Sequence, residues 1–353
     1  MKKIGVVFFT AVILFVSCQN KQDNKTGKAY YEGEDISDIA SIIRDKNTKT
    51  ATLLISVGGN WVLYAGVSDD KIDYSEPLAG GFQSGRYFLG SDSSRMYYQL
   101  ITDIGRGIFM EKRLPMEGGY NFRDLGGIKN KDGKYVKWGK LFRSDDMYNL
   151  TESDLNYLSG IPITSVVDFR AENEVKKAPD KIPASVKQDA IYSLPIMPGN
   201  LGNFVMEDIS GFSGEKIDAL MNEMYVSLVS DSSCIKQYRE LFRILQNENN
   251  VPLLFHCSAG KDRTGMATAF ILFALNVDEE TILEDYLSSN MYLGNKYAAV
   301  IKQNPNLKPL FEVKPEFLMT GIDKIKKDYG SIENYLKEVM NVDIDSFRSK
   351  YLY

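Results

Sequence analysis

The residues best suited to chemistry lie in one short stretch, Val251–Gly265, which reads VPLLFHCSAGKDRTG. An apolar run ends in Cys257, a loop of small and charged residues follows, and an apolar segment begins at Met266. This order predicts a buried strand, a tight loop and the start of a helix. Five residues separate Cys257 from Arg263, so a potential nucleophile and a guanidinium share one loop.

Such a loop can turn its backbone N–H groups toward one point, and the helix behind it adds its positive end. Arg263 can bind two phosphate oxygens at once, and the same positive field favours the thiolate form of Cys257. The alternative is a buried structural cysteine near a surface arginine, but the flanking strand and helix favour an anion cradle. The predicted cradle consists of Ser258, Ala259, Gly260, Lys261, Asp262, Arg263 and Thr264.

The composition narrows the kinds of site that this chain can build. Its 353 residues are enough for two domains, and the net charge of −5 gives no indication of nucleic-acid binding. Three cysteines and one histidine are too few for a disulfide framework or a structural zinc site. His256 is next to Cys257, and neighbouring strand residues point to opposite faces, so His256 is expected in the core or behind the loop. No metal or cofactor is expected, because Arg263 and the loop amides supply the positive field.

The N-terminus reads as an export signal. Positive charge at Met1–Lys3 precedes the apolar run Ile4–Val16, and Cys18 follows directly after Ser17. This resembles a lipoprotein signal at residues 1–17, cleaved before a Cys18 that is then lipidated. The alternative is an ordinary secretory signal with an incidental cysteine. Both signals would place the mature protein outside the cytoplasm. The lipoprotein signal predicts a lipid-anchored protein in the periplasm or at the cell surface. Residues 18–48 are then expected to form a tether.

Residues 49–114 predict a small, sandwich-like all-β domain of unknown partner. Short segments rich in aromatic and β-branched residues alternate with turns of Gly, Ser, Asn and Asp, which is typical of an antiparallel sandwich. Trp61, Tyr97 and Tyr98 are expected in its core rather than in a recognition surface. The expected strands are 50–57, 61–67, 86–89, 95–102 and 107–112.

Residues 115–353 predict an α/β domain with the cysteine loop at the carboxyl end of a strand. Thr151 and Asp154 suggest a capping box at the first helix, and no clear periodicity runs through residues 199–214. The expected strands are 163–169 and 251–257, and the expected helices are 151–158, 217–229, 235–246, 266–275, 278–303, 315–328 and 331–339.

Several separated motifs in this region resemble the bacterial atypical tyrosine/lipid phosphatase family. They are Asn121–Gly127 (NFRDLGG), Phe142–Ser144 (FRS), Val166–Arg170 (VVDFR), His256–Gly265 (HCSAGKDRTG), Asp285–Leu287 (DYL) and Tyr329–Leu336 (YGSIENYL). The resemblance implies a cysteine-type phosphatase that acts on phosphotyrosine and also on phosphoinositides. In such an enzyme Cys257 attacks phosphorus and forms a cysteinyl-phosphate, while Arg263 and the loop amides hold the remaining oxygens.

Three roles within this scheme stay open in the sequence. The proton donor is expected to be Asp168, with Asp262 as an ordering or acid–base residue, although Asp168 could instead pair with Arg170. Lys261 either adds positive potential at the mouth of the cradle or is a solvated surface charge. Thr264 could hydrogen-bond the thiolate, cap the helix, or do both.

Two other functions compete with hydrolysis. One is a lipoprotein module that binds a phosphorylated ligand without turnover, which the presence of Cys257, Arg263 and an acid disfavours. The other is sulfur transfer by a rhodanese-like loop, to which the remaining motifs are poorly suited.

Overall fold

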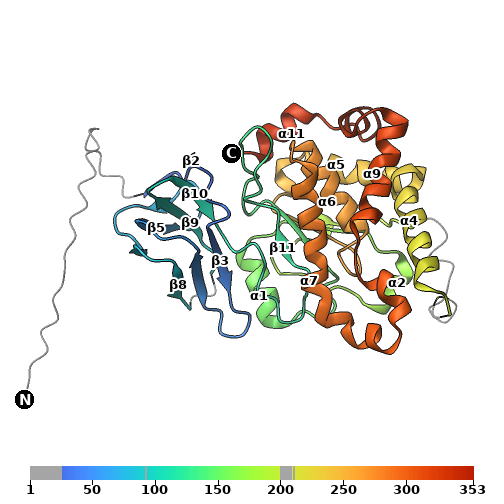
Figure 1. Ribbon diagram of the computed structural model, residues 1–353, viewed down its shortest axis with the longest axis horizontal. Helices are drawn as coiled ribbons and strands as arrows, with labels where there is room; N and C mark the ends of the chain where they lie inside the picture. Colours follow the sequence, from blue (N-terminus) through green and yellow to red (C-terminus); the bar gives the residue numbers. More distant parts are fainter. Residues whose placement is uncertain (1–25, 92–93, 199–208, 210) are drawn as a thin grey trace, which may run out of the picture.

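A computed structural model describes residues 26–91, 94–198, 209 and 211–353. The expected signal segment, Cys18 and most of the 199–214 loop lie outside the described residues. Figure 1 shows a β-rich module at the N-terminal side and a larger domain, with helices around a sheet, that contains the C-terminus. Among the described helices, none has the length and apolar content to cross a membrane.

The N-terminal module consists of two antiparallel sheets. Seven strands form one sheet in the order β1-β6-β5-β9-β10-β2, with β7 beside β5, and three form the other in the order β3-β4-β8. The strands are β1 (Thr26–Gly27), β2 (Glu32–Gly33), β3 (Ala40–Arg44), β4 (Ala51–Ile55), β5 (Trp61–Gly66), β6 (Ile72–Asp73), β7 (Ala79–Gly81), β8 (Gly85–Gly90), β9 (Tyr97–Thr102) and β10 (Gly105–Phe109). One apolar cluster joins Ile42 and Leu53 of the smaller sheet to Leu63 and Leu100 of the larger.

Two expectations for this module are resolved by the structure. Trp61 and Tyr98 are buried in the shared core, as expected, whereas Tyr97 donates a hydrogen bond of 3.2 Å to the Trp138 carbonyl of the larger domain. The expected tether is wrong over residues 26–48, which contribute β1, β2 and β3. In β3 every second residue is buried against the core, and this short alternation was too weak in the sequence to indicate a strand.

The larger domain is built on a five-stranded sheet with the order β11-β12-β15-β13-β14. The strands are β11 (Arg123–Asp124), β12 (Leu141–Ser144), β13 (Ser165–Asp168), β14 (Ile191–Ser193) and β15 (Leu253–His256). The last four in this order are parallel, and only β11 runs antiparallel. β15 is the central strand and is entirely buried, so the residues that follow it emerge at the middle of the carboxyl edge.

Helices pack around this sheet at nearly all the positions that the sequence predicts. They are α1 (Glu152–Gly160), α2 (Glu172–Lys177), α4 (Gly214–Ser230), α5 (Ser232–Leu245), α6 (Arg263–Ala274), α7 (Glu279–Gln303), α8 (Lys308–Phe311), α9 (Pro315–Tyr329), α10 (Ile332–Asn334) and α11 (Ile344–Tyr351). The capping box of Thr151 and Asp154 at α1 is confirmed. The expected helix at 331–339 is irregular, because α10 passes into a π-helical turn at Tyr335–Val339.

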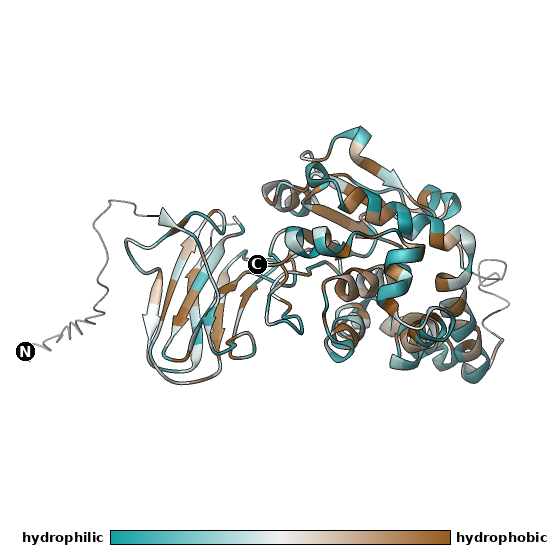
Figure 2. Cartoon of the chain, turned by 90° about the horizontal axis from the view of Figure 1, so that it is seen from above, coloured by the Kyte–Doolittle hydropathy of each residue, from teal (hydrophilic) through white to brown (hydrophobic). Residues whose placement is uncertain are grey.

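The module and the domain share a polar and aromatic contact. Arg95 Nη2 lies 2.7 Å from Asp124 Oδ2, and both side chains are almost fully buried. The ring of Tyr31 stacks on that of Tyr135 with 3.7 Å between the centroids. Figure 2 shows apolar residues along strands of both parts, while the helices carry both apolar and hydrophilic residues.

Candidate active site

The cysteine loop lies where the sequence predicts it, between β15 and α6. Cys257 is buried directly after the strand, and Arg263 is the first residue of the helix. Gly260 has φ of 66°, and a Cβ at this position would lie 2.2 Å from the Ser144 carbonyl oxygen. A glycine is therefore required here, both for its backbone conformation and for the close approach to β12.

A buried polar network holds the loop from behind. Arg143 Nη2 donates to the Gly260 carbonyl at 2.7 Å, and Asn121 Nδ2 donates to the Ala259 and Gly260 carbonyls at 3.1 and 3.0 Å. Because these carbonyls are bound on the rear side, the loop conformation is fixed from outside the cradle. These contacts arise from segments far away in the chain that β11 and β12 bring beside β15.

Asp285 of α7 completes this network. Its carboxylate accepts from Arg123 Nε at 2.9 Å and from Arg143 Nη1 at 2.6 Å, and both arginines are fully buried. Burial and the like charge of Arg123 lower the pKa of Arg143 to about 10, so Arg143 remains charged at neutral pH. Two guanidinium groups therefore face one carboxylate, which leaves net positive charge beneath the cysteine loop, where it favours a bound anion.

Arg263 is held by Glu174 of α2. The two Nη atoms of Arg263 each donate to one Glu174 oxygen at 2.7 Å, and Ser258 Oγ donates to Glu174 Oε1 at 2.5 Å. Burial opposes the charge of Glu174, but the hydrogen bond and charge of Arg263 lower its pKa to about 2. The sequence pattern at residues 171–174 was read only as a polar segment after a strand, so this contact was missed.

Asp262 lies inside the cradle with two partners. Tyr225 Oη donates to Asp262 Oδ1 at 2.8 Å, and Lys261 Nζ lies 2.8 Å from Asp262 Oδ2. The side chain of Lys261 is only 3% exposed, so the interpretation as a solvated surface charge is wrong. Its positive charge is largely offset by Asp262, and it contributes less potential at the mouth than the sequence suggested.

Asp168 is the last residue of β13, and its carboxylate is bound by Arg170. Arg170 Nε lies 3.0 and 3.1 Å from the two Asp168 oxygens, and its Nη2 donates to Oδ2 at 2.9 Å. The pairing with Arg170 is therefore the alternative that the structure supports. Asp168 is also only 10% exposed, compared with 19% for Asp262.

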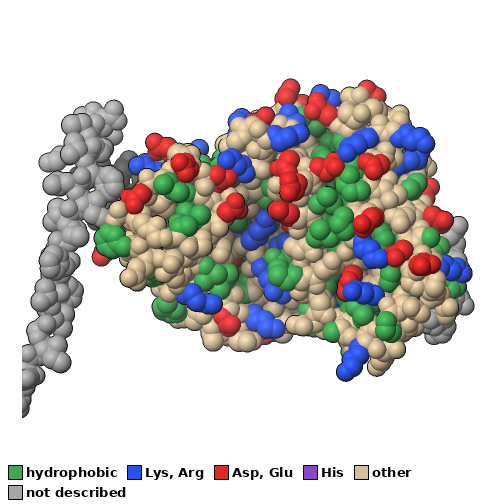
Figure 3. All heavy atoms as spheres, in the orientation of Figure 1, with side chains coloured by type: hydrophobic (Ala, Val, Ile, Leu, Met, Phe, Trp, Pro, Cys, Tyr) green, Lys and Arg blue, Asp and Glu red, His purple; other side chains and the backbone are tan. Residues whose placement is uncertain are grey.

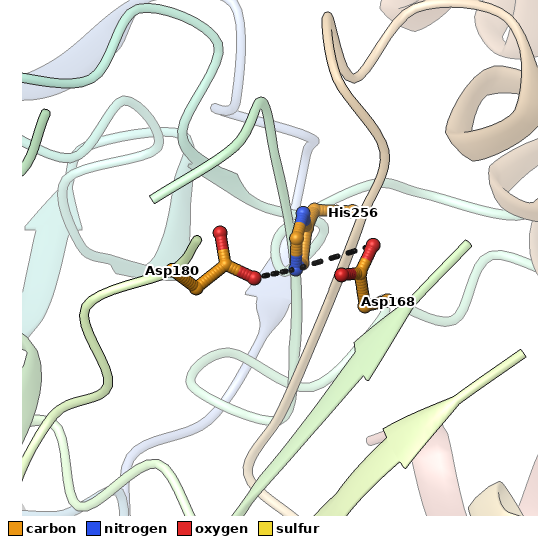
Figure 4. Close-up of side chains that lie close together, drawn as sticks. All are labelled: Asp168, Asp180 and His256. Atoms are coloured by element: carbon orange, nitrogen blue, oxygen red, sulfur yellow. Dashed lines mark ion pairs between the residues drawn. The ribbon is translucent and has the colours of Figure 1, made fainter. Parts of the chain in front are cut away.

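Asp168, Asp180 and His256 form a compact cluster beside the loop, and Figure 4 shows both carboxylates directed at the imidazole. His256 Nε2 lies 3.2 Å from Asp180 Oδ2 and 3.9 Å from Asp168 Oδ1. Burial opposes a charged imidazole, but the charge of Asp180 outweighs it and raises the pKa of His256 to about 9. His256 thus faces these acids as a cation, in agreement with the expected place behind the loop.

The same three residues could in principle offer ligand atoms to a metal, since those atoms lie within 4.8 Å of one another. However, Arg170 Nη2 donates to Asp168 Oδ2 at 2.9 Å and to Asp180 Oδ2 at 2.6 Å. The guanidinium and the imidazolium therefore already supply the cations of this cluster, and the donor set is a poor match for a metal ion.

Thr264 lies at the start of α6 with a fully buried side chain. Asp262 is the N-cap residue, and the cap has no side-chain hydrogen bond, so the expected helix-capping role of Thr264 is not observed. Among the described residues, none is a hydrogen-bond partner of Thr264 Oγ1. The hydroxyl therefore remains available to the cradle.

Comparison with known proteins identifies the family of this chain. A model described as the "Tyrosine phosphatase family" matches residues 114–353. The chain belongs to this family. The matched region begins where the β-rich module ends and includes Cys257, Arg263 and every residue of the network behind the loop.

Two curated relatives support the assignment of this phosphatase. A candidate tyrosine-protein phosphatase of Cupriavidus necator is 31% identical over 242 residues, which cover 66% of this chain and 85% of that protein. The triple specificity protein phosphatase PtpB of Mycobacterium tuberculosis is 26% identical over 260 residues, covering 63% and 92%. The core of the Saccharomyces cerevisiae PP-IP phosphatase Siw14 covers 53% of this chain and 94% of its own at 16% identity, with a TM-score of 0.27, which is too low to carry an argument.

The sequence therefore predicts the residues of the cysteine loop but not the contacts that hold this loop in place. The described structure brings Ser258, Lys261, Asp262, Arg263 and Thr264 together with Cys257, and places Asp168 in the neighbouring cluster. The motifs at Asn121–Gly127, Phe142–Ser144 and Asp285–Leu287 contain the network residues, although no role for these residues could be assigned from the sequence. On the face shown in Figure 3, acidic and basic side chains are interspersed.

Proposed function

We propose that this phosphatase hydrolyses phosphotyrosine through a cysteinyl-phosphate on Cys257. The observation that carries the proposal is the loop that joins Cys257 to Arg263, because one strand end presents both the nucleophile and a phosphate-binding guanidinium. The thiolate attacks phosphorus, the bond between phosphorus and the tyrosyl oxygen breaks, and the loop amides with Arg263 hold the three remaining oxygens. Water then attacks phosphorus, the S–P bond breaks, and inorganic phosphate leaves.

The proton for the tyrosyl oxygen comes, in this proposal, from Asp262. Asp262 belongs to the cysteine loop itself, and its side chain is more exposed than that of Asp168, whose oxygens are both bound by Arg170. In the second step the same carboxylate accepts a proton from the attacking water. In this proposal Thr264 Oγ1 hydrogen-bonds the leaving thiolate, and the lack of a partner for its hydroxyl among the described residues supports this role.

Phosphotyrosine is the principal substrate in this proposal, and phosphoinositides are a second class. The buried position of Cys257 favours a long aryl phosphate over the shorter phosphoserine. Lys261 supports binding of further phosphate groups, but its contact with Asp262 limits that contribution. The protein also acts outside the cytoplasm, anchored through lipidated Cys18, as its N-terminal sequence suggests.

The chemistry is tested with a phosphotyrosine peptide, the matching phosphoserine peptide and phosphoinositide vesicles. Wild type should release phosphate from the first fastest, and Cys257→Ser should release none. Rapid quenching with a radiolabelled phosphopeptide should leave label on Cys257 of the wild type. Equal rates for wild type and Cys257→Ser would overturn the proposal. Incorporation of radiolabelled palmitate that is lost in Cys18→Ala would support the anchor, and equal labelling of both would refute it.

A further inference from the structure

Glu174 engages one edge of Arg263 and leaves another edge open. The end of the guanidinium, formed by Nη1 and Nη2, donates to both Glu174 oxygens at 2.7 Å. The second Nη1 hydrogen is directed at the Phe169 carbonyl, at 3.3 Å. Of the five N–H groups of the guanidinium, the Nε hydrogen and one Nη2 hydrogen remain, and no described residue accepts from Nε.

These two remaining hydrogens lie side by side on the same edge of the guanidinium plane. This edge forms the parallel fork that binds two oxygens of a phosphate. A guanidinium that is free to rotate could present several edges to the cradle, and Glu174 selects one of them. Arg263 itself is confined, because its side chain is 16% exposed and its carbonyl accepts from Tyr238 Oη at 3.0 Å.

The Glu174 carboxylate is itself fixed before any ligand binds. Glu174 is the third residue of α2, and its Oε2 accepts from the Ala171 N–H at 2.9 Å, at the start of that helix. Its Oε1 accepts from Ser258 Oγ in the cysteine loop. The start of α2 therefore connects the carboxyl end of β13 to the loop, and the carboxylate does not depend on Arg263 alone for its position.

We propose that Glu174 is a positioning residue that presents the Nε–Nη2 edge of Arg263 to the transferring phosphoryl group. The inference rests on the proposed function of Cys257 and Arg263. The transition state carries its charge on the equatorial oxygens, so a correctly oriented guanidinium stabilises it more than it stabilises bound substrate. Glu174 consequently acts mainly on kcat and on the binding of transition-state analogues.

A competing interpretation uses the same contacts. A carboxylate that binds Arg263 and Ser258 could instead occupy the anion site and exclude phosphate. The two interpretations predict different effects of substituting Glu174. Removal of a competitor would strengthen phosphate binding, whereas removal of a positioning residue would lower kcat. The contacts favour a positioning role for Glu174. Its carboxylate leaves the Nε edge of Arg263 unoccupied, and the Ala171 N–H at the start of α2 holds it in place.

The test compares Glu174→Gln with Glu172→Gln on the same helix. Glu172 is 82% exposed, and its one ion-pair partner among the described residues is Lys176, so its variant is the matched control. For each protein, kcat and KM are measured with a phosphotyrosine peptide, together with inhibition by inorganic phosphate and by vanadate. We expect Glu174→Gln to lower kcat by about tenfold or more and to weaken vanadate inhibition more than phosphate inhibition, with KM changed by less than about threefold. Glu172→Gln should match wild type.

A double-mutant cycle with Arg263→Lys separates positioning from general structural damage. If Glu174 acts through Arg263, the effect of Glu174→Gln on kcat should largely disappear in the Arg263→Lys background. Tighter phosphate binding with unchanged kcat would overturn the inference in favour of competition. Unchanged kinetics with a lower melting temperature would also overturn it, as a purely structural contact. Failure of the proposed function is distinguishable, because wild type and Cys257→Ser would then have equal rates.

Discussion

Arg143 and Gly260 are joined by a hydrogen bond of 2.7 Å that reaches the cysteine loop from its rear side. Arg143 also binds Asp285, and Asp285 binds Arg123, so one carboxylate of α7 organises two buried arginines. The cysteine loop is thus positioned by residues outside the loop itself. The contribution of these residues to the unfolding free energy and the conformation of the loop are tested by separate substitutions.

Substitution of Asp285 by Asn should destabilise the protein strongly. The change leaves two buried guanidinium groups without their charged partner, which costs about 3–5 kcal/mol of unfolding free energy. Urea unfolding followed by circular dichroism measures this value. The control is Asp323→Asn, whose side chain is 68% exposed. A loss below about 1 kcal/mol for Asp285→Asn would contradict the stabilising role of the network.

Substitution of Gly260 by Ala should abolish activity. The added Cβ would meet the Ser144 carbonyl at 2.2 Å, and the positive φ itself costs about 1–2 kcal/mol for a residue other than glycine. Phosphotyrosine turnover and the melting temperature should both fall. Gly160→Ala is the control, because nothing lies within 4 Å of a Cβ at that position. Wild-type turnover in Gly260→Ala would show that the loop tolerates a different conformation.

The position of the loop in the fold could be predicted from sequence because its residues are consecutive. A strand, a cysteine, five further residues and an arginine at a helix start define the cradle locally, and the structure places them accordingly. The helices at 217–229, 235–246 and 278–303 were also predictable, since their apolar residues recur with helical spacing.

The surrounding contacts were not predictable in the same way. Arg143 meets Gly260 only because β12 lies beside β15, and Glu174 meets Arg263 across the end of β13. No local pattern encodes such pairings between distant segments. For Asp168 the sequence left open a role as proton donor or a pairing with Arg170, and only the structure shows that Arg170 contacts both carboxylate oxygens.

The assignment of the proton donor predicts a contrast between two aspartates. Asp262→Asn should lower kcat by about 10²–10⁴-fold for phosphotyrosine, whose leaving group needs a proton, and much less for dinitrophenyl phosphate. Asp168→Asn should retain the wild-type dependence on the leaving group, because its carboxylate serves Arg170. Turnover of a series of aryl phosphates measures both. The reverse pattern would return the role to Asp168.

The cluster around His256 predicts a stability that depends on pH. The folded protein raises the pKa of His256 from 6.5 to about 9, with Asp180 at 3.2 Å as the main cause that overcomes burial. The imidazolium therefore contributes its full stabilisation below about pH 6.5, and this contribution is lost as the pH rises through about 9. Asp180→Asn removes the partner, so its destabilisation relative to wild type should be greatest at low pH.

Thermal or urea unfolding of wild type and Asp180→Asn at pH 6, 8 and 10 tests this expectation. The difference in unfolding free energy should shrink by about 1–3 kcal/mol between pH 6 and pH 10. Groups that titrate in this range outside the cluster are present in both proteins and largely cancel in the difference. The exposed Asp189→Asn should show no such trend. A constant difference across the range would mean that Asp180 stabilises the fold through Arg170 and Met147 alone, and that His256 is not the titrating partner.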